Sequence, residues 1–374
     1  MRVLIAAGGT GGHIYPGITV AQVLRDQGAE VVFVGTKDGL EADVIPRAGF
    51  CLRAVRAHHI PRRVSWEVPM ALVVAVGGTY QAMKVIRQFR PHVVMGTGGY
   101  VSGPVLLAAT VLRYPTLIHE QNAFPGITNR MLARVVDEIA VGYAEAKTFF
   151  PAHKTVVTGN PVRPEISTCT REAGQRTFGL DPKRRTLLVT AGSQGARSVN
   201  RALLQAAPML HARRDLQVLH AAGRALYPEV VEQLRSRGVE PDAGGEKISY
   251  GNMCIMPYIY AMPEALAAAD LVVGRGGALS SAEFTIRGLP AILVPYPHAA
   301  ENHQLHNAQV LEAHGAAKVL LDHEISGQTL GSLVTQLLDT PGHLQSMARA
   351  SKRLGKPNAT GELVALVKAL AAPT

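Results

Sequence analysis

Short apolar runs alternate with longer amphipathic stretches along most of the chain. The first run, at residues 2–7, leads through a glycine-rich turn into residues 13–28, which have the apolar spacing of a helix. Further runs that are typical of strands lie at residues 30–36, 91–99, 115–122, 137–143 and 154–161. Because buried parallel strands joined by helices produce this alternation, the pattern predicts an α/β fold with a doubly wound parallel sheet.

The alternation is interrupted once and then starts again. The proline-containing sequence GNPVRPE marks the interruption, and strand patterns resume from residue 184. The sequences VLIAAGGTGGH and LLVTAGSQGAR each read as a strand, a glycine loop and the start of a helix, which indicates an internal duplication. We therefore predict two Rossmann-like domains that face each other across a cleft, at residues 1–161 and 162–345. Residues 346–374 contain a final helix that can pack back on the N-terminal domain.

The composition supports two globular domains. The chain has 374 residues, of which 47% are hydrophobic, enough for two cores of ordinary size. Its three cysteines lie far apart and form neither a metal-binding spacing nor a disulfide framework, which indicates a reducing compartment. No apolar run approaches the roughly 18–20 residues that a membrane-spanning helix needs. We therefore expect a soluble protein.

The net charge of +10 is unevenly distributed. Between Arg47 and Arg113 the chain has nine lysine and arginine residues and one acidic residue, Glu67. Apolar residues are interleaved with these charges at Ile60, Val64, Trp66, Val68, Met70 and Leu72. This combination suits an anionic membrane surface, and a solvated basic face beside a buried helix has the same composition. Since no aromatic-rich motif for reading nucleic acid is present, we do not expect nucleic acid as a partner.

Several glycine-rich turns directly follow predicted strands. Such a turn lets backbone N–H groups approach an anion at the positive end of the next helix, although a single turn can equally serve close packing. The turn that begins at Gly8 is not a dinucleotide fingerprint, because Ile14 stands where the third glycine would be. The turn GSQGAR lacks the lysine of a Walker loop. The repeated turns therefore predict phosphate binding by loops of another kind.

The sequence GRGGALSSAEF at residues 274–284 is the most informative of these turns. Ala278–Ser281 are expected to open a helix whose free N–H groups can bind a pyrophosphate. Glu283 can then accept hydrogen bonds from both hydroxyls of a ribose, or can stabilise the helix dipole. Neutral side chains at residues 298–307, among them Gln304 and Asn307, suit the hydroxyls of a sugar or cap the next helix. No spacing of acids and histidines typical of catalytic zinc appears, so we expect no metal and no cofactor.

Seven motifs follow one another along the chain. They are GGTGGH (Gly8–His13), GTGGYVSGP (Gly96–Pro104), HEQNAFPGITN (His119–Asn129), GNPVR (Gly159–Arg163), GSQGAR (Gly192–Arg197), GGALSSAE (Gly276–Glu283) and HQLHNA (His303–Ala308). In this order they resemble the MurG family of bacterial peptidoglycan N-acetylglucosaminyltransferases, and the resemblance extends from residue 1 to about residue 370.

The resemblance implies a GT-B type glycosyltransferase. Such an enzyme would transfer GlcNAc, with inversion, from UDP-GlcNAc to the MurNAc of undecaprenyl-pyrophosphoryl-MurNAc-pentapeptide, which converts lipid I to lipid II in peptidoglycan synthesis. It would act as a peripheral protein at the cytoplasmic face of the bacterial cell membrane. A UDP-sugar glycosyltransferase with another lipid acceptor, and a UDP-GlcNAc epimerase of the same fold, are the alternatives.

The resemblance also implies roles for individual residues. Arg163 and Ser193 would contact the nucleotide diphosphate, and Glu283 would bind the ribose. The uracil would be held by the backbone of Ile259, and the sugar by Gln304. The pyrophosphate would lie on Ala278, Leu279, Ser280, Ser281 and Ala282. From the N-terminal domain, donor contacts are expected at Thr10, Gly11, Gly12 and Asn122.

His13 is the candidate catalytic base. A helix N-terminus disfavours the imidazolium, so the ring tends to stay neutral and can take a proton from the acceptor hydroxyl. The same ring can instead cap its helix or bind the donor. His119 and Glu120 are rival candidates, unless they only hold a loop. By analogy, the diphosphate of the acceptor is expected on the glycine turns, with contacts to Gly99, Tyr100 and Ser102.

Overall fold

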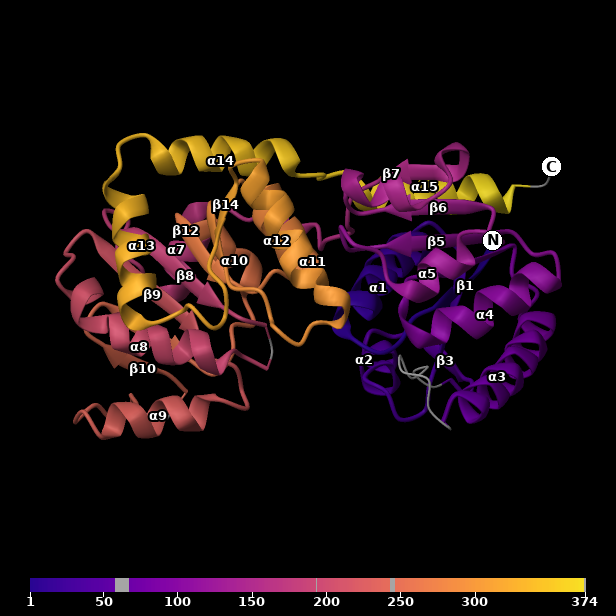
Figure 1. The fold of residues 1–374 in the computed structure, drawn as a ribbon, viewed down its shortest axis with the longest axis horizontal. Helices are drawn as coiled ribbons and strands as arrows, with labels where there is room; N and C mark the ends of the chain where they lie inside the picture. The colour runs from indigo at the N-terminus through magenta and orange to yellow at the C-terminus, as the bar shows by residue number, and fades with distance from the viewer. Residues whose placement is uncertain (58–66, 193, 243–245, 373–374) are drawn as a thin grey trace. The chain divides into compact units, whose positions relative to one another are not determined.

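The computed structural model describes residues 1–57, 67–192, 194–242 and 246–372 (Figure 1). It consists of two compact units. Unit 1 comprises Met1–Val162 together with Lys356–Thr374, and unit 2 comprises Arg163–Gly355. Each unit is built around one sheet of seven strands, so the α/β fold predicted from the alternation of apolar runs is confirmed.

The sheet of unit 1 is parallel throughout, in the order β3-β2-β1-β4-β5-β6-β7. Its strands are β1 (Arg2–Ala6), β2 (Glu30–Gly35), β3 (Cys51–Ala54), β4 (Val93–Gly96), β5 (Thr116–Glu120), β6 (Glu138–Val141) and β7 (Thr155–Val157). Alternate side chains of β1 enter different cores: Leu4 joins one core cluster, whereas Val3 and Ile5 join another. This alternation is what a strand buried on both faces produces.

Helices cover both faces of this sheet. They are α1 (Gly11–Asp26), α2 (Glu41–Arg47), α3 (Glu67–Phe89), α4 (Gly99–Val111), α5 (Ile127–Leu132) and α15 (Ala359–Ala371), with 3₁₀ turns η1 (Ala144–Phe149) and η2 (Ala152–Lys154). Buried residues of α3, α4 and α5 share one core cluster, and those of α1, α2 and α15 share the other. The glycine loops that follow β1 and β4 therefore enter helices on opposite faces of the sheet.

The sheet of unit 2 repeats this plan in the order β10-β11-β9-β8-β12-β13-β14. Its strands are β8 (Arg185–Thr190), β9 (Leu216–Ala221), β10 (Ile248–Tyr250), β11 (Met253–Met256), β12 (Leu271–Gly274), β13 (Ala291–Leu293) and β14 (Ala317–Val319). Only the β10–β11 pairing among the described strands of this sheet is antiparallel. In both units the first strand, β1 or β8, is central, and each is followed by a glycine loop and a helix, as the internal duplication predicts.

The helices of unit 2 run from α6 to α14. They are α6 (Glu165–Thr168), α7 (Arg171–Phe178), α8 (Arg197–His211), α9 (Tyr227–Arg235), α10 (Met262–Ala268), α11 (Ala278–Arg287), α12 (His303–Ala313), α13 (Gly327–Asp339) and α14 (His343–Leu354), with η3 (Ala300–Asn302). The expected end of the C-terminal domain at residue 345 falls inside α14, which belongs to unit 2 and packs against α11. After α14 the chain returns to unit 1, where Leu363 and Val367 of α15 are fully buried.

Candidate functional site

The candidate residues of unit 1 gather at the carboxyl edge of its sheet. Because its strands are parallel, the loops that leave β1, β4 and β5 emerge at the same edge, where ligands bind in open α/β sheets. The β1–α1 loop (residues 7–10) carries Thr10, which lies at the N-cap of α1. Gly11, Gly12 and His13 form the first turn of this helix. Their backbone amides therefore lie at the positive end of the helix.

The ring of His13 rests against the loop that follows β4. A Cβ atom added to Gly98 would lie 2.9 Å from His13 Cδ2, and one added to Gly99 would lie 3.3 Å from His13 Nδ1. Both glycines have positive φ angles, of 95° and 76°, which L side chains rarely adopt. On its other side, His13 Nδ1 lies 3.4 Å from Thr10 Oγ1. The half-buried imidazole is thus placed between the N-termini of α1 and α4.

The three residues expected to bind the acceptor have different surroundings. Gly99 and Tyr100 open α4, and the Tyr100 ring lies near Gly9 of the β1–α1 loop. The Ser102 hydroxyl is fully buried; it donates to Gly98 O at 2.7 Å and accepts from Gly98 N–H at 3.0 Å. Ser102 therefore fixes the turn at Gly98 with its side chain, and its hydroxyl is not presented to a ligand.

His119 and Glu120, the two rivals of His13, are both buried in β5. Burial lowers the pKa of His119 to about 4, and its Nε2 atom bonds to Gly159 O at 3.1 Å. The Glu120 carboxylate accepts from Asn122 N–H, Gly126 N–H and Asn129 Nδ2 at 2.8–3.1 Å, while burial raises its pKa. These contacts support a role in holding the loop that carries Asn122, and they leave His13 as the more accessible base.

In unit 2 the start of α11 has the geometry expected of a pyrophosphate site. The helix begins at Ala278 with Gly277 at the N-cap, so the amides of Ala278, Leu279 and Ser280 occupy its first turn. Ser281 is buried, and Ala282 lies in the second turn. A Cβ atom added to Gly276 would lie 2.2 Å from Gln304 O, so α12 packs directly on the loop before α11. This close approach brings Gln304 beside the predicted pyrophosphate site.

Glu283 and Arg163 are also neighbours in unit 2. Arg163 Nη2 lies 3.9 Å from Glu283 Oε1, and the glutamate side chain is 21% exposed. Burial raises the pKa of Glu283 to about 7, against the opposing effect of the Arg163 charge. The carboxyl group is therefore close to half ionised at neutral pH.

Ser193 and Ile259 are the remaining residues predicted for the donor site. Ser193 lies outside the described residues. Its neighbour Gly195 packs so closely on Ala222 O that an added Cβ atom would lie 2.2 Å away, which places the loop after β8 against the loop after β9. Ile259 is 2% exposed in the segment after β11, between Tyr258 and Tyr260, whose rings make an edge-to-face contact.

Gln304 and Asn307 do not cap α12, contrary to one of the two interpretations of the sequence. Gln304 Oε1 accepts from Tyr296 N–H at 3.0 Å, and buried Asn307 donates through Nδ2 to Gly276 O at 3.0 Å. Just before this helix, Glu301 and Asn302 have φ angles of 54° and 52°. Strained non-glycine residues of this kind are concentrated at functional sites.

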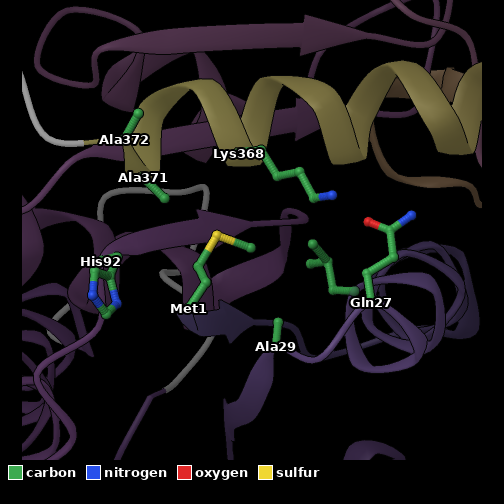
Figure 2. Close-up of a pocket in the computed structure, with 8 residues that line it drawn as sticks. Met1, Gln27, Ala29, His92, Lys368, Ala371 and Ala372 are labelled. Atoms are coloured by element: carbon green, nitrogen blue, oxygen red, sulfur yellow. The ribbon is translucent and has the colours of Figure 1, made fainter.

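Two cavities lie at the amino edges of the sheets, one in each unit, on the side away from the carboxyl edges that carry the glycine loops. The first, of about 280 Å³, is lined by Met1, Ala29 and His92, which precede β1, β2 and β4, and by Lys368 of α15 (Figure 2). The second, of about 770 Å³, is lined in part by Asp270 and Pro290, which precede β12 and β13. Both therefore lie away from the glycine loops. Among the described residues, no group of three histidine, cysteine or acidic side chains could hold a metal ion.

Comparisons with known proteins agree along nearly the whole chain. Residues 3–141 match the N-terminal domain of glycosyltransferase family 28, and residues 186–363 match its C-terminal domain. A Moorella thermoacetica protein named UDP-N-acetylglucosamine--N-acetylmuramyl-(pentapeptide) pyrophosphoryl-undecaprenol N-acetylglucosamine transferase is 45% identical over 98% of both chains. The chain belongs to the MurG family. A Halalkalibacterium halodurans protein of the same name is 40% identical over 99% of this chain and 100% of its own.

Solved structures confirm the fold expected for a MurG-family chain. The crystal structure of Acinetobacter baumannii MurG has a TM-score of 0.77 and 30% identity, and covers 98% of this chain and 99% of its own. A UDP-GlcNAc 2-epimerase from Neisseria meningitidis bound to UDP-GlcNAc has a TM-score of 0.65 over 98% of this chain and 100% of its own. At 16% identity this second likeness shows the fold alone.

One buried acid of this MurG-family chain could not be identified from its sequence. Glu41, at the start of α2, is fully buried and accepts a hydrogen bond from Gly9 of the β1–α1 loop. In the sequence it appears as one of several acids in an ordinary amphipathic stretch, 32 residues from its partner. No local signal distinguishes it, because its environment is created by loops from separate parts of the chain.

Proposed function

We propose that this protein transfers GlcNAc from UDP-GlcNAc to the MurNAc of undecaprenyl-pyrophosphoryl-MurNAc-pentapeptide, with inversion at the anomeric carbon. The observation that carries the proposal is the 45% identity, over 98% of both chains, to a protein whose name states this activity. The arrangement of side chains in each unit supports it, as the following steps describe.

The donor is proposed to bind unit 2. The first-turn amides of α11 and the guanidinium of Arg163 can take the charge of the pyrophosphate, including the charge that develops on UDP as it leaves. Glu283 accepts hydrogen bonds from the ribose, Ile259 binds uracil through its backbone, and Gln304 binds the sugar. Ser193 would add a contact from the β8–α8 loop. Because the N–H groups of the first turn of α11 are fixed by the backbone, they need little reorganisation during transfer.

The acceptor is proposed to bind unit 1. His13 takes the proton of the attacking MurNAc hydroxyl, which displaces UDP from the anomeric carbon in one step. Thr10, Gly11, Gly12 and Asn122 contact the donor from this unit. The acceptor diphosphate would use the amides of Gly99 and Tyr100 at the start of α4, where helix-end N–H groups suit an anion.

A transfer assay with a lipid I analogue tests the proposed function. We expect radiolabelled GlcNAc to move from UDP-GlcNAc to the acceptor, with UDP as the second product. Incubation with UDP-GlcNAc alone is the control. Formation of an epimer without acceptor, or transfer only to a different lipid, would contradict the proposal and favour one of the alternatives.

We also propose that unit 1 docks on an anionic membrane surface at the cytoplasmic face of the cell membrane. Exposed apolar side chains lie on α3, α4 and α5, which cover one face of the sheet: Val76, Tyr80, Leu107, Val111, Ile127 and Met131. Basic residues accompany them, and Lys84 Nζ lies 4.8 Å from the Tyr80 ring centroid. Apolar groups with adjacent cations suit a lipid interface.

The apolar residues predicted between Ile60 and Leu72 lie outside the side chains that the structure describes. Among the described residues, no helix has the length and apolar character to cross a bilayer.

Vesicle sedimentation tests the docking surface. Val76 and Val111 are 71% and 59% exposed, so Val76→Glu and Val111→Glu should leave the fold intact. We expect each to lower binding to vesicles that contain phosphatidylglycerol, because an anion enters the lipid-facing surface. Val156→Glu, at a 40% exposed site on β7, is the matched control. Equal binding by all three variants would contradict this docking surface.

A further inference from the structure

A buried carboxylate lies directly behind the β1–α1 loop. Glu41 is the first residue of α2, and its side chain is fully buried. Its Oε2 atom accepts from Gly9 N–H at 3.2 Å. Its Oε1 atom accepts from Thr36 N–H at 3.1 Å and from Thr36 Oγ1 at 2.6 Å. The carboxylate therefore joins the loop after β1 to the loop after β2.

Three glycines make room for this carboxyl group. A Cβ atom added to Gly8 would lie 2.8 Å from Glu41 Oε1, one added to Gly35 would lie 2.7 Å from Glu41 Cγ, and one added to Gly39 would lie 2.4 Å from Glu41 Cδ. No real Cβ atom approaches so closely, so side chains at these positions would displace the glutamate. Gly8 of the β1–α1 loop thus serves the packing of a carboxylate, together with Gly35 of β2 and Gly39 of the β2–α2 loop.

The burial of Glu41 is expensive unless its hydrogen bonds compensate for it. Removing a carboxylate from water without a hydrogen-bonding or charged partner costs several kcal/mol of desolvation free energy, unless the group takes up a proton. Among the described residues, no ion pair of Glu41 with a lysine, arginine or histidine is found within 4 Å. An apolar residue would fill the same space without this penalty. The three hydrogen bonds therefore point to a requirement for a fixed loop conformation.

The loop that Glu41 holds leads directly to His13. Gly9 has a φ angle of 95°, and the next residue, Thr10, occupies the N-cap position of α1, with its Oγ1 atom 3.4 Å from His13 Nδ1. On the other side of Gly9, Gly8 O packs so closely on Gly99 that an added Cβ atom would lie 2.3 Å away. A change in the Gly8–Gly9 peptide would therefore move both neighbours of the His13 ring.

We propose that Glu41 is a positioning residue, which locks the β1–α1 loop through Gly9 N–H and so holds Thr10 and His13 in place for transfer. The proposal rests on the proposed function, because the step it serves is proton removal by His13. It also means that Gly9 N–H is already occupied, so an anion bound at this loop must use the amides that begin at Thr10.

Glu41→Gln is the principal test, because the amide keeps the size of the side chain but cannot accept at both ends. One N–H of the loop is then left opposite an NH₂ group. We expect kcat to fall by about 10- to 100-fold, which is the order of effect that a misplacement near 1 Å has. The affinity for UDP should change less than twofold, because the groups proposed to bind UDP lie in unit 2. Thr36→Val removes only the 2.6 Å bond and should shift kcat in the same direction by a smaller factor.

Asp43→Asn on the same helix is the matched control, since Asp43 is exposed and pairs with Arg47 at 2.8 Å. A kcat within twofold of wild type in Glu41→Gln, with a lowered melting temperature, would overturn the proposal and leave Glu41 a purely structural residue. Parallel loss of UDP affinity would overturn it as well, because the effect would then not be confined to unit 1.

A second readout does not depend on transferase activity. The ring resonances of His13, assigned by their loss in His13→Ala, should shift in Glu41→Gln but not in Asp43→Asn, while those of buried His220 in unit 2 should not move. Unchanged His13 resonances would overturn the proposal. If the wild-type protein fails to transfer GlcNAc but the His13 shift is observed, the proposed function fails and the positioning role stands.

Discussion

At the residue scale, some features of the His13 environment can be predicted from the sequence and others cannot. The glycine turn and the start of a helix are visible in the sequence, so a histidine at a helix N-terminus could be predicted. The contact of His13 with Gly98 and Gly99 could not be predicted. It joins two loops that are 85 residues apart in the sequence, and these loops meet only because β1 and β4 are neighbours in the sheet. Glu41 belongs to the same class, because its bond to Gly9 joins residues 32 positions apart.

His13→Ala tests the base. We expect kcat to fall by about 10²–10⁴, the usual contribution of a positioned general base, while the KM for UDP-GlcNAc stays nearly unchanged. Steady-state kinetics with saturating acceptor measure both constants. His323→Ala is a suitable control because that side chain is 77% exposed. Near-normal turnover in His13→Ala would remove the ring from the chemistry.

The proposed ribose contact of Glu283 predicts a pH dependence of donor binding. Burial raises the pKa of Glu283 from 4.5 to about 7, so the carboxylate proposed to accept from the ribose hydroxyls forms only as the pH rises through neutrality. We expect the KM for UDP-GlcNAc to fall between pH 6 and pH 8, and Glu283→Gln to abolish that trend while raising the KM. In Arg163→Ala the midpoint should move to higher pH, because the Arg163 charge opposes the rise. A pH-independent wild-type KM would contradict this assignment.

At the scale of elements, the long buried strands were predictable, whereas most of the short, partly exposed ones were not. The strands β1, β2 and β8 are continuous apolar runs, and the sequence pattern located them. The pattern missed β3, of four mostly exposed residues, β11, of four alternately buried residues, and β10 and β14, of three residues each. These segments are strands because a neighbouring strand offers hydrogen bonds, which is a tertiary effect that local propensity does not contain.

Two strands carry buried histidines that make the fold sensitive to acid. Burial lowers the pKa of His119 in β5 to about 4 and that of His220 in β9 to about 3. Between those values and the ordinary value of 6.5, the unfolded chain binds more protons than the folded chain, so stability is lost as the pH falls below 6.5. For each of the two histidines, we expect the free energy of unfolding to fall by about 2 kcal/mol between pH 7 and pH 5.

Urea unfolding at the two pH values measures this loss. We expect His119→Gln and His220→Gln each to show a smaller decrease from pH 7 to pH 5 than the wild type, although both are less stable at pH 7. The exposed His323→Gln variant should follow the wild type. An identical decrease in all four proteins would show that other groups dominate the acid sensitivity.

At the scale of the whole molecule, the chain passes from unit 1 to unit 2 after Val162 and returns after Gly355. The first crossing coincides with the proline-rich sequence GNPVRPE, whose composition signals a boundary. The second is harder to place from sequence, because α14 and α15 are similar amphipathic helices separated by only four residues. Which helix joins which unit is decided by the surfaces that they cover.

Leu363→Ala tests the contribution of α15 to unit 1. Leu363 is fully buried in the core shared with α1, so its truncation should destabilise unit 1 by about 2–5 kcal/mol. Calorimetry should show an unfolding transition that moves to lower temperature, while UDP binding measured below that transition is retained. Glu362→Ala, at the exposed preceding position, is the control. Loss of UDP binding in folded Leu363→Ala would show that the units do not respond separately.

The return of the chain to unit 1 has a consequence for synthesis on the ribosome. Unit 2 is encoded without interruption, so a nascent chain can fold it as soon as its last helix emerges. Unit 1 begins first but needs Leu363, Val364 and Val367 to complete its core, and these are translated only after the whole of unit 2. The unit that is started first is therefore completed second, and until α15 emerges it exposes the apolar core residues that Leu363, Val364 and Val367 cover, which favours aggregation of the nascent chain.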